Sequence, residues 1–178
     1  KMVAVNALLA QSIHTVCADS YNGGYFRIYS SLSLKDNIKS GDSYYMVEIK
    51  AIKRMFDAAA EGGCAVLGFV DEVLRGTNTT ERIAASSTIL TYLNNMNALV
   101  FAATHDLELA NILKDKYDNY HFEEEMTDND VKFPYKLCKG KATGKNAIRL
   151  LGVLGFEHDI TEYAENMVKC FDEKGYWI

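Results

Sequence analysis

Two near-continuous apolar stretches, residues 64–70 and 98–103, dominate the hydrophobic pattern of the chain. Such runs are typical of strands buried on both faces, as in a parallel sheet that is covered by helices. A shorter stretch, residues 25–29, predicts an earlier strand. Helix-like segments separate these strands, so the alternation predicts an α/β fold with a largely parallel sheet flanked by helices.

The segment after residue 43 has apolar residues at spacings of four, three and four, which predict one face of a helix: Tyr45, Ile49, Ile52 and Phe56. Residues 62–63, both glycine, should end this helix. Asn78 and Glu81 have the spacing of a capping pair, which predicts the start of a second helix. This helix is expected to reach about Met96.

The pattern changes after residue 105. It predicts a short helix, two strands that form a late β-hairpin, and two C-terminal helices, at residues 106–114, 119–125, 131–138, 146–154 and 159–171. Asp159, with Glu162 three residues later, should begin the last helix. Three consecutive acids, residues 123–125, cannot converge on a metal ion, because neighbouring residues of a strand point to opposite faces.

Two adjacent carboxylates, Asp71 and Glu72, follow the central apolar strand. In nucleotide hydrolases the first acid of such a pair can hold Mg²⁺, and the second can orient or deprotonate the attacking water. An isolated Asp-Glu pair is more often a simple polar turn, so the neighbouring motifs must decide between these interpretations.

Three segments then occur in a recognisable order: residues 41–48 (Gly-Asp-Ser-Tyr-Tyr-Met-Val-Glu), residues 71–82 with Asp-Glu and Arg-Gly-Thr, and residues 99–105, ending in Thr-His. Together they resemble the MutS family of DNA mismatch-repair ATPases, whose signature segment is typically Ser-Thr-Phe-Met-Val-Glu. The resemblance covers essentially the whole chain. It is nearest to a MutS-like subgroup with Arg-Gly-Thr-Asn-Thr and Thr-His-Asp.

The resemblance implies the C-terminal ATPase domain of such a protein, a P-loop NTPase fold of the ATP-binding-cassette type, with ATP and Mg²⁺ as cofactors. It implies that Asp71 binds the metal, that Glu72 is catalytic, and that His105 senses the γ-phosphate. It further implies that Ser43 and its helix N-terminus close over the nucleotide of a partner subunit, so that the active unit is a homodimer. The structural alternatives are a helix cap for Ser43 and an ordinary hydrogen-bonding role for His105.

No phosphate-binding loop of the form Gly-x-x-x-x-Gly-Lys-Ser/Thr occurs in the chain. Residues 140–146 come nearest, but only three residues separate their glycines, and Asn146 replaces the metal-binding hydroxyl. The resemblance places the missing loop immediately before Lys1, as in a domain truncated just after that loop. We therefore expect the chain alone to be a poor ATPase.

Composition adds further expectations. The length of 178 residues fits one domain over residues 1–178, and no apolar run of about 18 residues predicts a membrane span, so a cytoplasmic location is expected. The net charge of -5 suggests that DNA is bound through other domains of the parent protein. The four cysteines show no spacing typical of zinc or redox sites and are predicted to be reduced core thiols; His14, His121 and His158 are assigned no chemistry.

The sequence leaves two functions open. The first is an ATP-hydrolysing domain of a MutS-like mismatch-repair protein, whose nucleotide state switches a DNA-bound dimer. The alternative is a nucleotide-dependent dimerisation module of a MutS-like protein that does not act in mismatch repair. Retention of Asp71, Glu72 and His105 together favours the first.

Overall fold

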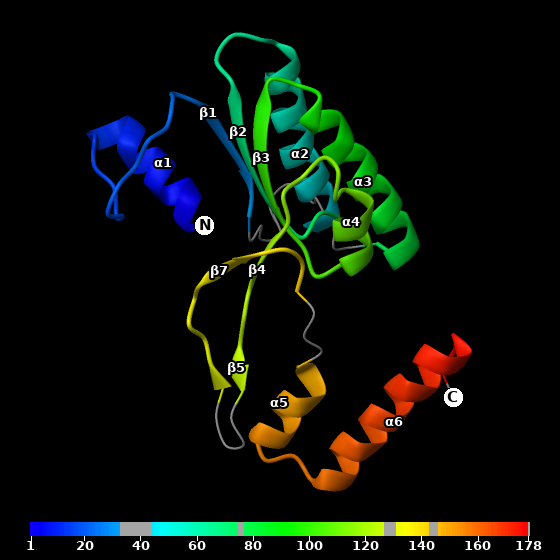
Figure 1. Ribbon diagram of the computed structural model, residues 1–178. Coiled ribbons are helices and arrows are strands. Elements are labelled where there is room, and N and C mark those ends of the chain that lie inside the picture. Colours follow the sequence, from blue (N-terminus) through cyan, green and yellow to red (C-terminus); the bar gives the residue numbers. More distant parts are fainter. Residues whose placement is uncertain (33–43, 75–76, 127–130, 143–145, 178) are drawn as a thin grey trace. The chain divides into compact units, whose positions relative to one another are not determined.

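The computed structural model describes residues 1–32, 44–74, 77–126, 131–142 and 146–177 (Figure 1). These residues form two compact units, Lys1–Tyr117 and Asp118–Ile178. The prediction of a single domain over residues 1–178 stays a prediction. No helix in the described part of the chain is both long enough and apolar enough to cross a membrane.

The first unit contains a parallel three-stranded sheet in the order β1-β2-β3, with β1 at Arg27–Ser31, β2 at Val66–Asp71 and β3 at Ala98–Ala103. Its helices are α1 (Met2–Ile13), α2 (Tyr44–Ala60), α3 (Thr79–Asn94) and α4 (Leu107–Ile112). The predicted α/β class and parallel sheet are therefore confirmed for this unit.

The central strand β2 is covered on both faces, as its continuous apolar sequence predicts. Val66 and Val70 belong to the main core, which they share with residues of α2, α3 and α4. Leu67 and Phe69 belong to a second core with Ala7 of α1. Successive side chains of a strand point to opposite faces, so a sequence that is apolar throughout can supply both cores.

The neighbouring strand β3 differs from its prediction as a strand buried on both faces. Leu99 is 51% exposed and Phe101 is 44% exposed, although both are apolar. Phe101 still stacks on Phe69, with ring centroids 5.4 Å apart. Among the described residues the second core gathers on β1 and β2, so this face of β3 lies at the rim of that core.

Helix boundaries follow from local chemistry. The side chain of Asn78 accepts a hydrogen bond of 2.9 Å from the Glu81 N–H, which confirms the predicted cap of α3. In α2, Ile52 is buried, and Ile49 and Phe56 pack against the main core, as their spacing predicts. The expected start of that helix at Ser43 lies outside the described residues.

The second unit contains the predicted hairpin and helices. β4 (Tyr120–Phe122) pairs with β7 (Leu137–Lys139), and β5 (Glu125–Met126) pairs with β6 (Val131–Lys132), both antiparallel. Helices α5 (Ala147–Val153) and α6 (His158–Lys174) follow. The last helix begins at His158, one residue before the predicted start, and its N-cap is Glu157, so Asp159 lies in the first turn and does not cap the helix.

Candidate functional site

The candidate site lies where β2 and β3 end side by side. The two strands are parallel neighbours, with Asp71 opposite Ala103, so their carboxyl ends bring distant parts of the sequence together. The Glu72 N–H continues the pairing by donating a 2.9 Å hydrogen bond to the carbonyl oxygen of Ala103. This geometry follows directly from the parallel register.

Glu72 has a left-handed backbone with φ of 54°, and Leu74 has φ of 60°. Non-glycine residues seldom adopt this conformation, and the surrounding structure must hold them in it. Part of that support comes from the buried side chain of Glu48 on α2, which accepts a hydrogen bond from the Leu74 N–H. A second contact is the 3.2 Å hydrogen bond from the Ser86 hydroxyl to the Val73 carbonyl oxygen.

His105 contacts Glu72 directly. Its Nε2 lies 3.0 Å from Oε1 of Glu72, a hydrogen-bond distance that requires a proton on Nε2. The Glu72 side chain is 20% exposed, whereas the imidazole is 92% exposed. The structure thus brings together two of the residues that the sequence singled out, with one partly enclosed and the other open to solvent.

Asp71 ends β2 beside this pair. Its Oδ2 lies 3.9 Å from Nζ of Lys1, and the side chains are 33% and 66% exposed, respectively. An ion pair this long and this exposed contributes little to stability. Ser43, the other predicted nucleotide-contacting residue, lies outside the described residues.

Arg82, which the sequence pattern did not single out, also contributes to the site. The Arg82 guanidinium on α3 donates to both carboxylate oxygens of Asp106, over 2.9 Å and 2.7 Å. The side-chain hydrogen bond to Asp106 raises the pKa of Arg82, and the negative charges of Asp106, Glu72 and Glu108 act in the same direction, while desolvation opposes them. The Asp106 N–H in turn donates to the Thr104 hydroxyl over 3.0 Å.

A cavity of about 100 Å³ lies among these groups, lined by Glu72, Val73, Arg82, Thr104, His105 and Asp106. Acidic, basic and imidazole groups therefore converge on one small polar hollow. Such convergence is typical of binding or catalytic sites.

The residues that sequence reasoning missed carried partial signals. Glu48 lies four residues before Ile52, so it is a charged residue on the buried face of a helix, and such a residue usually has a buried partner. Arg82 and Asp106 gave no comparable signal, because they are 24 residues apart and only the packing of α3 beside β3 brings them together.

The cysteines depart from their prediction as core thiols. All four are free in the structure, but Cys17 and Cys64 are exposed. The Cys64 thiol donates a 3.0 Å hydrogen bond to the carbonyl oxygen of Tyr25. Cys64 lies before β2 begins at Val66, so its apolar neighbours in the sequence do not make it part of the core.

Comparison with known proteins decides the family. The family model of MutS domain V matches residues 1–172. The chain belongs to the MutS domain V family. This confirms the membership of the MutS family that the three sequence segments suggested.

Individual relatives agree with this assignment to MutS domain V. The chain is 29% identical over 172 residues to the DNA mismatch repair protein MutS 2 of Haloarcula marismortui, an alignment that covers 94% of this chain and 18% of that protein. It is 31% identical over 152 residues to DNA mismatch repair protein MutS of Aquifex pyrophilus, covering 83% of this chain and 17% of that protein. Human MutS protein homolog 4 is 34% identical over 128 residues, covering 67% of this chain and 13% of that protein.

The chain thus spans about a fifth or less of the length of these relatives. Within that span, the MutS domain V match covers both compact units. The polar hollow at the ends of β2 and β3 therefore belongs to the matched region.

Proposed function

We propose that this chain is the ATP-binding and ATP-hydrolysing domain of a MutS-like DNA mismatch-repair protein, with a fold of the ATP-binding-cassette type. The observation that carries the proposal is the contact between Glu72 and His105 at the carboxyl ends of adjacent parallel strands, with Asp71 beside it. In open α/β sheets, ligands bind at this edge. Membership of MutS domain V and the mismatch-repair names of the relatives support the same assignment.

The donor chemistry of the site fits Mg²⁺, since carboxylate oxygens are the ligands that this cation prefers. Asp71, which is one-third exposed, would hold it. Bound Mg²⁺ would neutralise charge on the phosphate oxygens. The 178 residues contain no matching phosphate loop, so the phosphate cradle would come from another part of the parent protein.

The two remaining residues would act on the attacking water. Glu72, with its carboxylate partly enclosed, would accept the proton of that water. His105 would orient the water or donate a hydrogen bond to the γ-phosphate, because its exposed ring already contacts Glu72 through Nε2. Arg82 and Asp106 would hold the segment that carries His105.

We further propose that ATP joins two copies of the complete domain into a dimer, and that DNA is held by other domains of the parent protein. A net charge of -5 on this chain agrees with the second statement, since phosphate backbones are bound by clustered cations. Ser43 and its helix N-terminus would complete the partner's site, as the resemblance implies.

The deciding experiment is Glu72→Gln in the complete parent protein. The amide keeps the shape of the side chain but loses its proton-accepting charge, so ATP binding should persist while single-turnover hydrolysis slows by about 10²-fold to 10⁴-fold. Asp71→Asn should instead raise the Mg²⁺ concentration that hydrolysis requires. The exposed Glu165 on α6 provides a matched control, and Glu165→Gln should leave both measurements unchanged.

An unchanged hydrolysis rate in Glu72→Gln would remove Glu72 from the mechanism. If the wild-type protein binds ATP and dimerises without hydrolysing it, the domain is the nucleotide-dependent dimerisation module instead. Measuring ATP binding, dimerisation and hydrolysis together therefore separates a hydrolysing domain from a dimerisation module.

A further inference from the structure

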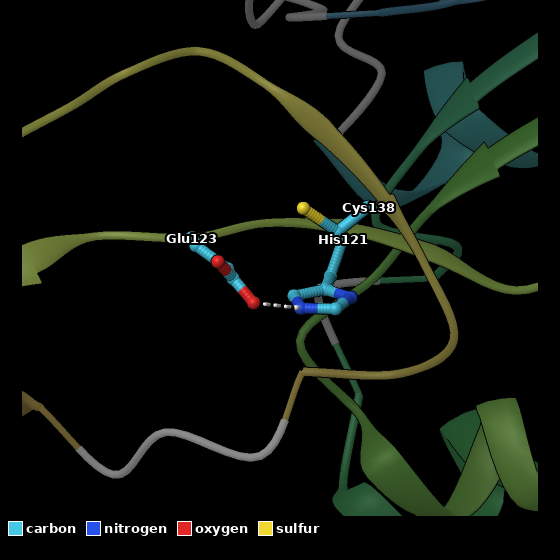
Figure 2. Close-up of side chains that lie close together, drawn as sticks. All are labelled: His121, Glu123 and Cys138. Carbon is cyan, nitrogen blue, oxygen red and sulfur yellow. Dashed lines mark ion pairs between the residues drawn. The ribbon is translucent and has the colours of Figure 1, made fainter.

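A second group of potential metal ligands lies in the hairpin of the second unit. His121 of β4 is the direct cross-strand partner of Cys138 of β7. Glu123 follows His121 by two residues, so it returns to the same face of the chain. Figure 2 shows the imidazole, the carboxylate and the thiol close together.

The three ligand atoms lie within 4.8 Å of one another, and Nε2 of His121 is 3.5 Å from Oε1 of Glu123. This spacing is loose for a direct hydrogen bond but suits three groups arranged around one ion. Cys138 and His121 are partly buried, whereas the Glu123 side chain is 64% exposed. The group is thus enclosed on one side and open to solvent on the other.

The backbone sets the orientation and tautomer of His121. Nδ1 lies 3.0 Å from the carbonyl oxygen of Gly140, which can only accept a hydrogen bond, so Nδ1 carries the proton. In the neutral ring, Nε2 then presents its lone pair toward the Glu123 carboxylate. Two acceptors would then face each other, and a cation bound between them would relieve their repulsion. Histidines that bind metals commonly donate their other ring N–H to a carbonyl or carboxylate in this way.

We propose that His121, Glu123 and Cys138 bind one Zn²⁺ ion. Zinc takes nitrogen, oxygen and sulfur ligands together, whereas Mg²⁺ and Ca²⁺ prefer oxygen alone. Three protein ligands leave a fourth position for water. The thiol coordinates as the thiolate, and its proton passes to solvent.

Zinc bound at this site would cross-link a part of the hairpin in which the strands are short. β4 and β7 are three residues long each, and short strand pairs are only marginally stable by themselves. A metal joining Cys138 to His121 crosses between these strands. Because a ligand that binds only the folded state stabilises that state, zinc should raise the unfolding temperature of the chain.

The alternative is that a proton, rather than a metal, lies between His121 and Glu123. An imidazolium–carboxylate pair would then account for the geometry, and Cys138 would take no part. Under this alternative, the Cys138 thiol contributes nothing to metal binding. Participation of the Cys138 sulfur therefore distinguishes the metal site from the protonated pair.

The test uses the purified 178-residue chain after treatment with a chelator. Titration with Zn²⁺ should give one tight site per chain, and Co²⁺ should produce a thiolate-to-cobalt charge-transfer absorption. Cys138→Ser should abolish that absorption and weaken Zn²⁺ binding by at least about 100-fold, since even outer partners of metal ligands cost about 10-fold to 100-fold. Glu123→Gln, a change of similar size at an exposed position, should weaken binding by about tenfold or more.

Two controls use residues of the same unit. Cys170→Ser removes another partly buried thiol, and His158→Gln removes a histidine that pairs with Glu162 at 3.8 Å on one helix. Neither should change the affinity or the absorption. The proposal is overturned if the chain binds Zn²⁺ no more tightly than the buffer does. It is also overturned if the cobalt absorption survives Cys138→Ser, or if Glu123→Gln binds zinc as tightly as the wild type does.

Discussion

The Arg82–Asp106 pair joins two elements that carry the candidate site. Its two hydrogen bonds connect α3 to the residue that follows His105, and both side chains are largely enclosed. A paired guanidinium and carboxylate of this geometry is stronger and more directional than a lysine contact. Positions that are adjacent in the site thus depend on a contact between residues far apart in the sequence.

Arg82→Lys should lower the free energy of unfolding by about 1 kcal/mol, because lysine cannot form both hydrogen bonds. The exposed Lys53–Asp57 pair on α2 provides the comparison, and Lys53→Ala should cost about 0.5 kcal/mol or less. Urea denaturation of both variants measures the difference. Equal losses would show that enclosure adds nothing to the Arg82 pair.

The phenol of Tyr117 should make the free energy of unfolding decrease at high pH. Burial raises the pKa of its phenol from 10.0 to about 12, and its hydroxyl donates a 3.0 Å hydrogen bond to the Leu90 carbonyl oxygen. The unfolded chain ionises first as the pH rises, so this contribution is complete below pH 10 and is lost as the pH rises to about 12.

Across that range the wild type should lose about 2 kcal/mol more than Tyr117→Phe loses. The measurement is the free energy of unfolding as a function of pH. Tyr92→Phe, at an exposed position on α3, is the matched control for loss of a phenol. If the wild type and Tyr117→Phe have parallel profiles, Tyr117 does not ionise differently in the two states.

At the scale of elements, α2 packs closely on β2 at Gly68. A Cβ atom there would lie 2.5 Å from Sδ of Met55, a residue that is fully buried. The absence of a side chain at Gly68 therefore allows the helix to approach the strand. This strand carries Asp71 at its end, so the packing also positions the candidate site.

Gly68→Ala should destabilise the fold by about 1 to 3 kcal/mol, because the core must move to admit a methyl group. The same substitution at Gly152 of α5 should have the opposite effect. There the added Cβ meets only the Thr161 methyl group at 3.9 Å, and alanine favours a helix by about 0.5 to 1 kcal/mol. Thermal or urea unfolding of the two variants tests the sign of each change.

At the scale of the whole molecule, the family match spans both compact units, although the candidate ATP site lies in the first and the candidate zinc site in the second. The proposed ATP-dependent dimer adds a further level. Each composite site would take Asp71 and Glu72 from one subunit and Ser43 from the other.

Mixing a Ser43→Arg subunit with a Glu72→Gln subunit of the complete parent protein tests this arrangement. One composite site would carry both defects and the other neither, so hydrolysis should return to as much as about half the wild-type rate per mixed dimer, as expected for independent sites. Each variant alone should stay inactive. If mixed dimers form and remain inactive, the shared-site model in which the two sites work independently is wrong.

The sequence by itself determined the parts that depend on local pattern. A continuous apolar run predicted that β2 is buried on both faces, and the spacing of Asn78 and Glu81 predicted the cap of α3. The sequence also placed Glu72 and His105 just after two predicted strands, and both strands are present, as β2 and β3. Short-range periodicity and strand direction contain enough information for these features.

Only the tertiary structure decided the features that depend on distant partners. One such feature is the left-handed turn at Glu72, which the side chain of Glu48 supports. Another is the Arg82–Asp106 pair, which joins residues from separate elements. The exposure of one face of β3 depends on where the second core ends. His121 and Cys138 are likewise opposite each other only because the hairpin register places them there. Composition and spacing cannot specify such contacts, because each is fixed by the packing of whole elements rather than by neighbouring residues.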